Sequence, residues 1–299
     1  MKKVAILCAA ILALIAPESK AAAQGMPADY AAVLKTLGKP GDFKGNVLKV
    51  NIPRGDLVVA IDGVIAPMPF GFSGWVAMTK GDRGMDVMMG DLVLTEREVN
   101  PVMSAVLDAG LDVTALHNHF FFETPRIYYM HVHGMGTAAQ LAAKIKPAVD
   151  LIGKGIGDLV MGSGPNLAAG LTADRVAKII GTPGEQTGSV YKITIGRPDL
   201  DVREHGARID ARMGLNTWAA FTGGDADAMV AGDVAMTSAE VTPVLTAMRG
   251  AGLQIVAIHH HMLTGQAVYF LHYWGRGPAE KLAAGVRAAL DQLGTAKVK

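Results

Sequence analysis

The second half of this 299-residue sequence repeats the first, and the duplication constrains the fold more than any other feature. The strongest matches pair 45–57 (GNVLKVNIPRGDL) with 188–200 (GSVYKITIGRPDL), and 90–111 (GDLVLTEREVNPVMSAVLDAGL) with 232–253 (GDVAMTSAEVTPVLTAMRGAGL). Because the register continues through most of each half, each half should fold as a complete copy of one unit. We expect the two units to span residues 24–152 and 171–299, joined by a glycine-rich linker at 153–170.

Each half predicts the same order of elements: a short helix, several strands, a helix, a β-hairpin and a final helix. Consecutive strands of this kind pair antiparallel, and amphipathic helices then cover one face of the sheet. The fold class that we expect is α+β. It consists of two tandem copies of a mostly antiparallel sheet with helices packed on it, related by a pseudo-two-fold axis.

The middle helix of each half has two possible beginnings. In the first half, Thr95 and Glu98 have the spacing of a capping box, whereas Asn100 and Pro101 have that of an N-cap followed by proline. Proline deeper in a helix sacrifices a hydrogen bond, so we favour the start at Asn100. Gly110 should end this helix in the left-handed conformation.

Residues 1–23 predict a secretory signal peptide, with two early lysines, an apolar run at 4–16 and a small-residue end at 21–23. We therefore expect an exported, periplasmic or secreted protein that is cleaved before Gln24. The only cysteine, Cys8, lies in this leader, so the mature chain can form neither disulfides nor thiolate metal sites. No later segment offers about 20 uninterrupted apolar residues, so we expect no membrane span.

The charge balance excludes one large class of partner. The whole chain has a formal net charge of +1. Removing a leader with a net charge of about +2 leaves the mature protein near neutrality, without the basic surface that nucleic-acid binding needs. The expected partner is a metal ion or a small molecule.

Eight of the nine histidines lie in two similar segments, 115–134 (ALHNHFFFETPRIYYMHVHG) and 257–275 (AIHHHMLTGQAVYFLHYWG), and the ninth is His205. Both segments are rich in β-branched and aromatic residues and are bounded by turn formers, which indicates β-hairpins. Their strands are apolar on the face opposite the histidines as well, so we expect them in the middle of a sheet.

Alternation along the strands places four histidines of the first hairpin on one face: His117, His119, His131 and His133. A turn centred on Pro125 would set His117 opposite His133 and His119 opposite His131. The second hairpin aligns when one residue is removed from its turn, and three of the four positions then hold histidine again: His259, His261 and His272. Trp274 replaces the fourth, and His260 falls on the other face.

Histidine is the commonest transition-metal ligand, and paired His-x-His motifs on neighbouring strands can supply three or four nitrogens to one ion. We predict a transition metal ion, zinc or copper, as the cofactor. Glu123 is a possible additional ligand, because His117-x-His119-x-x-x-Glu123 resembles the first metal motif of cupins. The candidate metal ligands are His117, His119, His131, His133, His259, His261 and His272.

Three functions are compatible with these residues. Metal binding or storage comes first, and a metal-dependent hydrolase with an open coordination position comes second. The third is a non-metal small-ligand binding protein. Against all three stands a structural role, in which the histidines are hydrogen-bonded members of a polar core layer.

Other residues repeat between the halves. Lys49 matches Lys192 and Arg54 matches Arg197, and either pair could bind an anion, although ion pairs with nearby aspartates are the commoner explanation. The matching tryptophans at 75 and 218 are expected as core anchors rather than as a binding platform.

At GDLVLTEREVNPVMSAVLDAGLDVTALHNHFF, YMHVHG and YFLHYWG, the sequence resembles the LppY/LpqO-like family of secreted bacterial proteins. The resemblance covers nearly all of the mature chain. It implies a duplicated domain of exported proteins of unknown function, and it brings no assignment of catalytic residues. Some members of that family look like lipoproteins, whereas this chain lacks a usable lipobox.

Overall fold

The computed structural model describes the whole chain except residues 1–24, 155–156, 158, 263–264, 266 and 295–299. The predicted signal peptide therefore lies outside the described residues. No helix among the described residues is long and apolar enough to cross a membrane.

The first half contains three α-helices and one six-stranded sheet, with strand order β1-β2-β5-β6-β9-β7. The bounds of these helices are α1 Ala28–Leu37, α2 Glu96–Asp108 and α3 Ala138–Leu151. The bounds of these strands are β1 Gly41–Lys44, β2 Val47–Pro53, β5 Ser73–Lys80, β6 Asp86–Thr95, β7 Asp112–His117 and β9 Ile127–Gly136.

The second half repeats this sheet with the order β10-β11-β14-β15-β17-β16, and all pairs in both sheets are antiparallel. Its helices are α4 Ala173–Ile180, α5 Ser238–Gly250 and α6 Ala279–Leu290. Its strands are β10 Glu185–Thr187, β11 Val190–Gly196, β14 Asn216–Gly223, β15 Ala228–Met236, β16 Gln254–His260 and β17 Tyr269–Gly277. The predicted pair of units with antiparallel sheets and helices is confirmed.

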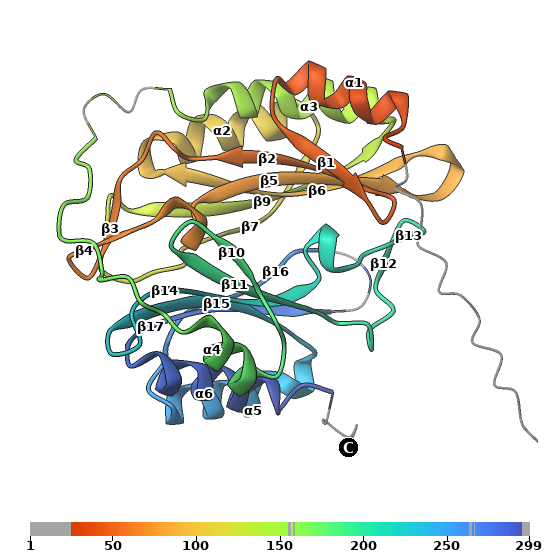
Figure 1. Ribbon diagram of the computed structural model, residues 1–299. Coiled ribbons are helices and arrows are strands. Elements are labelled where there is room, and N and C mark those ends of the chain that lie inside the picture. The colour runs from red at the N-terminus through yellow and green to blue at the C-terminus, as the bar shows by residue number, and fades with distance from the viewer. Residues whose placement is uncertain (1–24, 155–156, 158, 263–264, 266, 295–299) are drawn as a thin grey trace, which may run out of the picture.

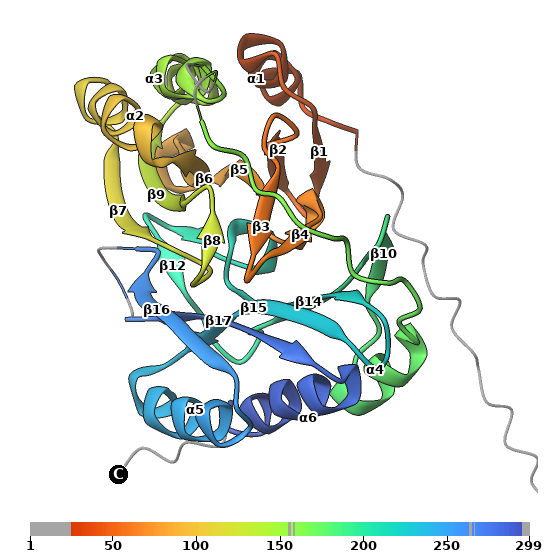
Figure 2. The ribbon, with the colours of Figure 1, turned by 90° about the vertical axis from the view of Figure 1, so that its left-hand side faces the viewer.

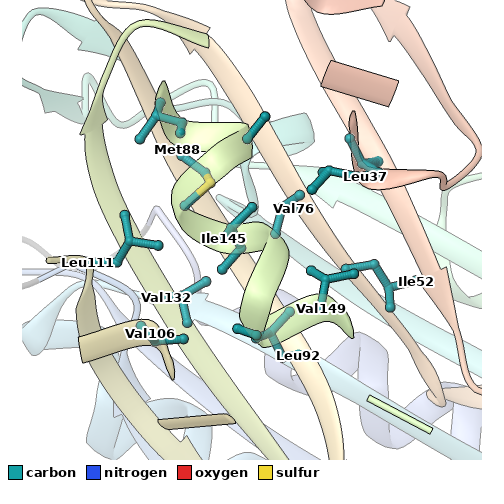
Figure 3. Packing of buried hydrophobic residues seen from close by; sticks show 14 of the residues in the cluster. Leu37, Ile52, Val76, Met88, Leu92, Val106, Leu111, Val132, Ile145 and Val149 are labelled. Carbon is teal, nitrogen blue, oxygen red and sulfur yellow. The ribbon is translucent and has the colours of Figure 1, made fainter. Parts of the chain in front are cut away.

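The two sheets face each other, and each carries its helices on the outer face, so the protein has four layers (Figure 1). In the outer core of the first unit, Ile145 and Val149 of α3 pack on Val76, Met88 and Leu92 of the sheet (Figure 3). The second unit has the equivalent outer core beneath α4, α5 and α6. Each strand presents alternate side chains to the helices, which leaves the intervening side chains for the layer between the sheets.

Smaller elements occupy the connections. The strands β3 Val59–Ile61, β4 Val64–Ala66 and β8 Glu123–Thr124 form a three-stranded sheet, and β12 Arg203–Glu204 pairs with β13 Ala207–Arg208. Three single-turn 3-10 helices lie at Met68–Phe70, Asp82–Gly84 and Ala211–Met213.

These connections cross between the units. Val59, Ile61 and Phe70 of the first unit pack against Met229 and Ala231 on the inner face of the second sheet. In return, Leu200, Ile209 and Met213 pack against Ala77 and Met89 on the inner face of the first sheet. Two apolar clusters therefore hold the sheets together, and the histidines lie in the same layer.

The expected start of the middle helix is wrong. Helix α2 begins at Glu96 with Thr95 as its N-cap, and Pro101 lies inside it. The Glu98 carboxylate accepts hydrogen bonds from the Thr95 backbone N–H (2.7 Å) and from the Arg54 guanidinium (2.7 Å). This buried network offsets the single hydrogen bond that the proline cannot make. Gly110 is left-handed, as predicted, with φ of 66°.

Candidate metal centre

Both predicted histidine segments form strand pairs, but the register of the pairing and the place of the strands in the sheets differ from the prediction. His117 lies opposite Tyr129 and His131 opposite Ala115, and the pairing also shifts by one residue between Val113 and Ala115. The chain between β7 and β9 is also longer than a tight turn, since β8 leaves to pair with β3. The predicted His117–His133 and His119–His131 pairs are therefore wrong. The strands β9 and β17 lie inside the sheets, as predicted, whereas β7 and β16 are edge strands.

Six of the seven predicted histidines nevertheless come together in the layer between the sheets. The edge strands β7 and β16 lie near each other on the same side of the molecule (Figure 2), which brings the two histidine segments into contact. The six residues are His117, His119, His131, His259, His261 and His272.

The closest ring contacts in this six-histidine cluster each join one unit to the other. The rings of His117 and His259 stack with centroids 3.8 Å apart. The centroid distance is 3.7 Å for His119 with His272, and 4.0 Å for His131 with His261. In the alignment of the repeats, each unit's histidines correspond to those of the other. The pair His117–His259 therefore corresponds to itself, and the other two pairs correspond to each other. The cluster is thus shared equally between the units.

Two groups of three histidines have one ring nitrogen each within 4.8 Å of the others. The first group is His117, His259 and His272, and the second is His131, His259 and His261. His259 belongs to both triads. Its Nδ1 lies 3.2 Å from the His260 carbonyl oxygen, so Nδ1 carries the proton and Nε2 is free to coordinate. Metal-bound histidines ordinarily donate their second N–H in this way.

Most of the remaining ring nitrogens have no partner. Eight buried nitrogens of His117, His119, His259, His261 and His272 make no hydrogen bond within the described structure. Each unpartnered buried polar atom costs about 1–3 kcal/mol, and a folded domain is stable by only about 5–15 kcal/mol. Within the cluster, a hydrogen bond joins two rings, between His117 Nε2 and His131 Nε2 at 3.0 Å. Hydrogen bonding among the histidines therefore accounts for only part of the arrangement, and the two triads could hold a metal ion.

Burial keeps the cluster uncharged. Desolvation holds the pKa of the buried imidazoles well below the usual value, and neighbouring histidine rings add to the effect in each of them. For His259, burial lowers the pKa to about 4. Neutral imidazole is the form that coordinates metals, so the cluster offers its lone pairs at neutral pH.

Three predicted ligands, His119, His133 and Glu123, lie outside both triads, and of these only His119 belongs to the cluster, through its stacking on His272. His133 Nε2 lies 3.6 Å from Glu204 Oε1, and its Nδ1 lies 3.8 Å from Asp112 Oδ2. It shares the inner face with His131 but is two residues further along β9, about 6–7 Å away. Glu123 accepts a hydrogen bond from the Ile127 N–H at 3.0 Å, and burial raises its pKa to about 8. It belongs to the small sheet and not to the cluster.

The structure also identifies two acids that the sequence reasoning missed. Asp91 pairs in register with His131, and Asp233 pairs with His272, so both side chains lie on the inner faces. Burial raises the pKa of Asp91 to about 7 and that of Asp233 well above its usual range. The signal was present in the sequence, because both aspartates follow a glycine at the same position of the repeat.

An open cleft of about 220 Å³ leads to the cluster. Asp91 and His119 line it together with residues of both units. The repeated lysines and tryptophans meet here: Lys49 Nζ lies 4.3 Å from the centre of the Trp75 ring, and Lys192 Nζ lies 4.3 Å from that of Trp218. The tryptophans pack against the two inner apolar clusters, as expected of core anchors, and they also line the cleft.

The repeated arginines have a structural role instead. Arg54 pairs with Asp56 at 2.7 Å and with Glu98 at 2.7 Å, and it is almost fully buried. Arg197 makes the equivalent pairs in the second unit. Pairing with nearby aspartates, the commoner explanation, thus holds for the arginines, and each guanidinium also fixes the start of a helix.

Residues 31–151 and 174–292 each match one family of proteins, described as Domain of Unknown Function (DUF1259). The chain belongs to this family. Two copies of the DUF1259 domain, one in each half, agree with the duplication seen in the sequence and in the sheets. No curated protein matches the chain.

Some solved structures resemble the chain weakly. The trimeric bacterial microcompartment shell protein PduB is 12% identical over 85% of this chain and 93% of its own, with a TM-score of 0.20. EtuB from Clostridium kluyveri is 10% identical over 85% of this chain and 91% of its own, with a TM-score of 0.22. Similarities of this size carry no information about what this DUF1259 protein binds.

Proposed function

We propose that this protein binds one divalent transition metal ion, zinc or copper, through the six-histidine cluster. The observation that carries the proposal is the set of eight buried ring nitrogens without hydrogen-bond partners, contributed by both units. Imidazole suits both metals, and no carboxylate belongs to either triad. A pseudo-two-fold relation between the units is part of the proposal. It is supported by the ring contacts, because each contact between the units has an equivalent contact when the two repeats are aligned.

Export completes the proposal. The leader at 1–23 supports a periplasmic or secreted protein, and the resemblance to the LppY/LpqO-like family supports the same location. An exported protein meets metal ions outside the cytoplasm, where a neutral-histidine site can hold or buffer them.

Metal-dependent hydrolysis is the second candidate function. The cleft beside His119 favours it, since a substrate could approach the cluster from solvent by this route. Three nitrogens with an exchangeable water would form an open site of the catalytic kind.

Elemental analysis tests the first proposal. Tag-free protein, exported during expression and purified without chelators, should contain about one zinc or copper ion per chain. Protein that cannot be loaded with either metal would leave non-metal ligand binding as the explanation of the cluster. Turnover of esters, phosphoesters and carbohydrates, with His117→Ala and His259→Ala as controls, separates hydrolysis from binding alone.

A further inference from the structure

The cleft beside the cluster is lined by two ammonium groups, one from each unit, and by one acid, Asp91. Lys49 and Lys192 both line it, and neither forms an ion pair with any of the described residues. Arg54 and Arg197, the other repeated cations, are each neutralised by two carboxylates. The unpaired lysines therefore call for a different explanation.

The two ammonium groups repel each other. Burial lowers the pKa of Lys49 to about 8, and repulsion from Lys192 contributes. One acid, Asp91, lines the same cleft and attracts both lysines, but none of the described carboxylates lies within 4.0 Å of either ammonium group. A bound anion would remove the repulsion between the two lysines and keep both charged.

The size and walls of the cleft limit what can enter. Its volume of about 220 Å³ lies below the roughly 300–1,000 Å³ typical of pockets for drug-sized ligands, so it suits a small molecule. Asn51 and Ser73 add hydrogen-bonding groups near the lysines, and two tryptophan rings add apolar surface. At its inner end the cleft reaches His119, whose ring stacks on His272 of the cluster.

We propose that this cleft binds a small organic oxyanion, a carboxylate or a phosphate ester, with its charge between Lys49 and Lys192 and its body against Trp75 and Trp218. The anion site is inferred from the lysines and the cleft alone. If the proposed metal site is also correct, the bound anion lies within reach of the metal ion, and this consequence rests on the proposed function.

Titration calorimetry of full-length mature protein tests the anion site, with metal-free and zinc-loaded protein measured in parallel. Succinate and glycerol phosphate are the two oxyanion probes, and succinamide is the uncharged control. We expect both protein forms to bind at least one oxyanion and not succinamide. Lys49→Gln and Lys192→Gln should each weaken binding about 10- to 100-fold, the range for hydrogen bonds to charged groups.

Lys178→Gln is the matched control, since Lys178 is exposed on α4, away from the cleft, and should leave the affinity unchanged. Circular dichroism and metal content should be unaltered in all three variants. Absence of oxyanion binding in both forms, or equal affinities in the wild type and the cleft variants, would overturn the proposal. Oxyanion binding by a protein that takes up no metal would sink the metal proposal and leave the anion site standing.

Discussion

Replacing His259 with alanine should abolish tight metal binding, because this is the residue that both triads share. Structural zinc sites with four ligands have apparent binding free energies of about 10–16 kcal/mol, so one ligand accounts for roughly 3–4 kcal/mol if the total divides evenly. That difference corresponds to a weakening of about two to three orders of magnitude. His259→Ala leaves each triad with two nitrogens, so neither can take over the role of the other.

Competition with a chromophoric chelator measures this directly, on metal-free protein titrated with zinc or copper. His260→Ala is the matched control, because His260 is the next residue of β16 but its Nδ1 lies 3.1 Å from the Val268 carbonyl oxygen, and its ring packs on Tyr269 instead of the cluster. It should bind metal like the wild type, with a stoichiometry of one. An affinity of His259→Ala within tenfold of the control would refute the shared-ligand reasoning.

Three further results are expected. Arg54→Ala should lower the free energy of unfolding by about 3–5 kcal/mol in urea denaturation, because it leaves two carboxylates of a buried network unpaired; Lys146→Ala, from an exposed ion pair, should cost under about 1 kcal/mol. The free energy of unfolding of the metal-free protein should fall from pH 7 to pH 5, because the unfolded chain protonates its histidines near pH 6.5, whereas burial lowers their pKa in the folded protein, to about 4 for His259. Three buried carboxyl groups with raised pKa act in the opposite direction, but the six imidazoles outnumber them. A urea midpoint that is constant or rises over this range would contradict it. Free metal at about 1,000 times its dissociation constant should stabilise the fold by about 4 kcal/mol, so calorimetry should show a melting temperature that falls when a chelator is added.

The architecture of each unit could be predicted from the sequence, because every element appears twice, once in each repeat. Helices α3 and α6 bury apolar residues at intervals of four, Leu141, Ile145 and Val149 in the first unit and their counterparts in the second, which is the spacing of an amphipathic helix. The alternation of strands predicted which face carries the histidines. Periodicity is a property of single elements, so it can be read from one chain without knowledge of the fold.

The register and the partners of the histidines could not be read in the same way. His117 lies opposite Tyr129 and not opposite His133, a difference of four residues in register, and the irregular pairing beside Ala115 accounts for a shift of only one residue. Nothing in the local residues marks this register. The neighbour of His133 outside the cluster is Glu204, which the other unit supplies. Contacts between units are set by how the sheets face each other, and local sequence does not encode that arrangement.

The structure makes the two units inseparable, and this explains why the site requires the duplication. In a separated unit the inner face of the sheet would lose its cover, since the segment around Phe70 covers the second sheet and the segment around Met213 covers the first. The same separation would leave three imidazoles on each side, without the ring partners that the other unit supplies. Joining the units in one chain converts a bimolecular encounter into an intramolecular one, so that the six rings assemble at any protein concentration. Burial between two apolar clusters then keeps the rings neutral and shielded from water, which is the condition under which imidazole nitrogens bind a metal most strongly.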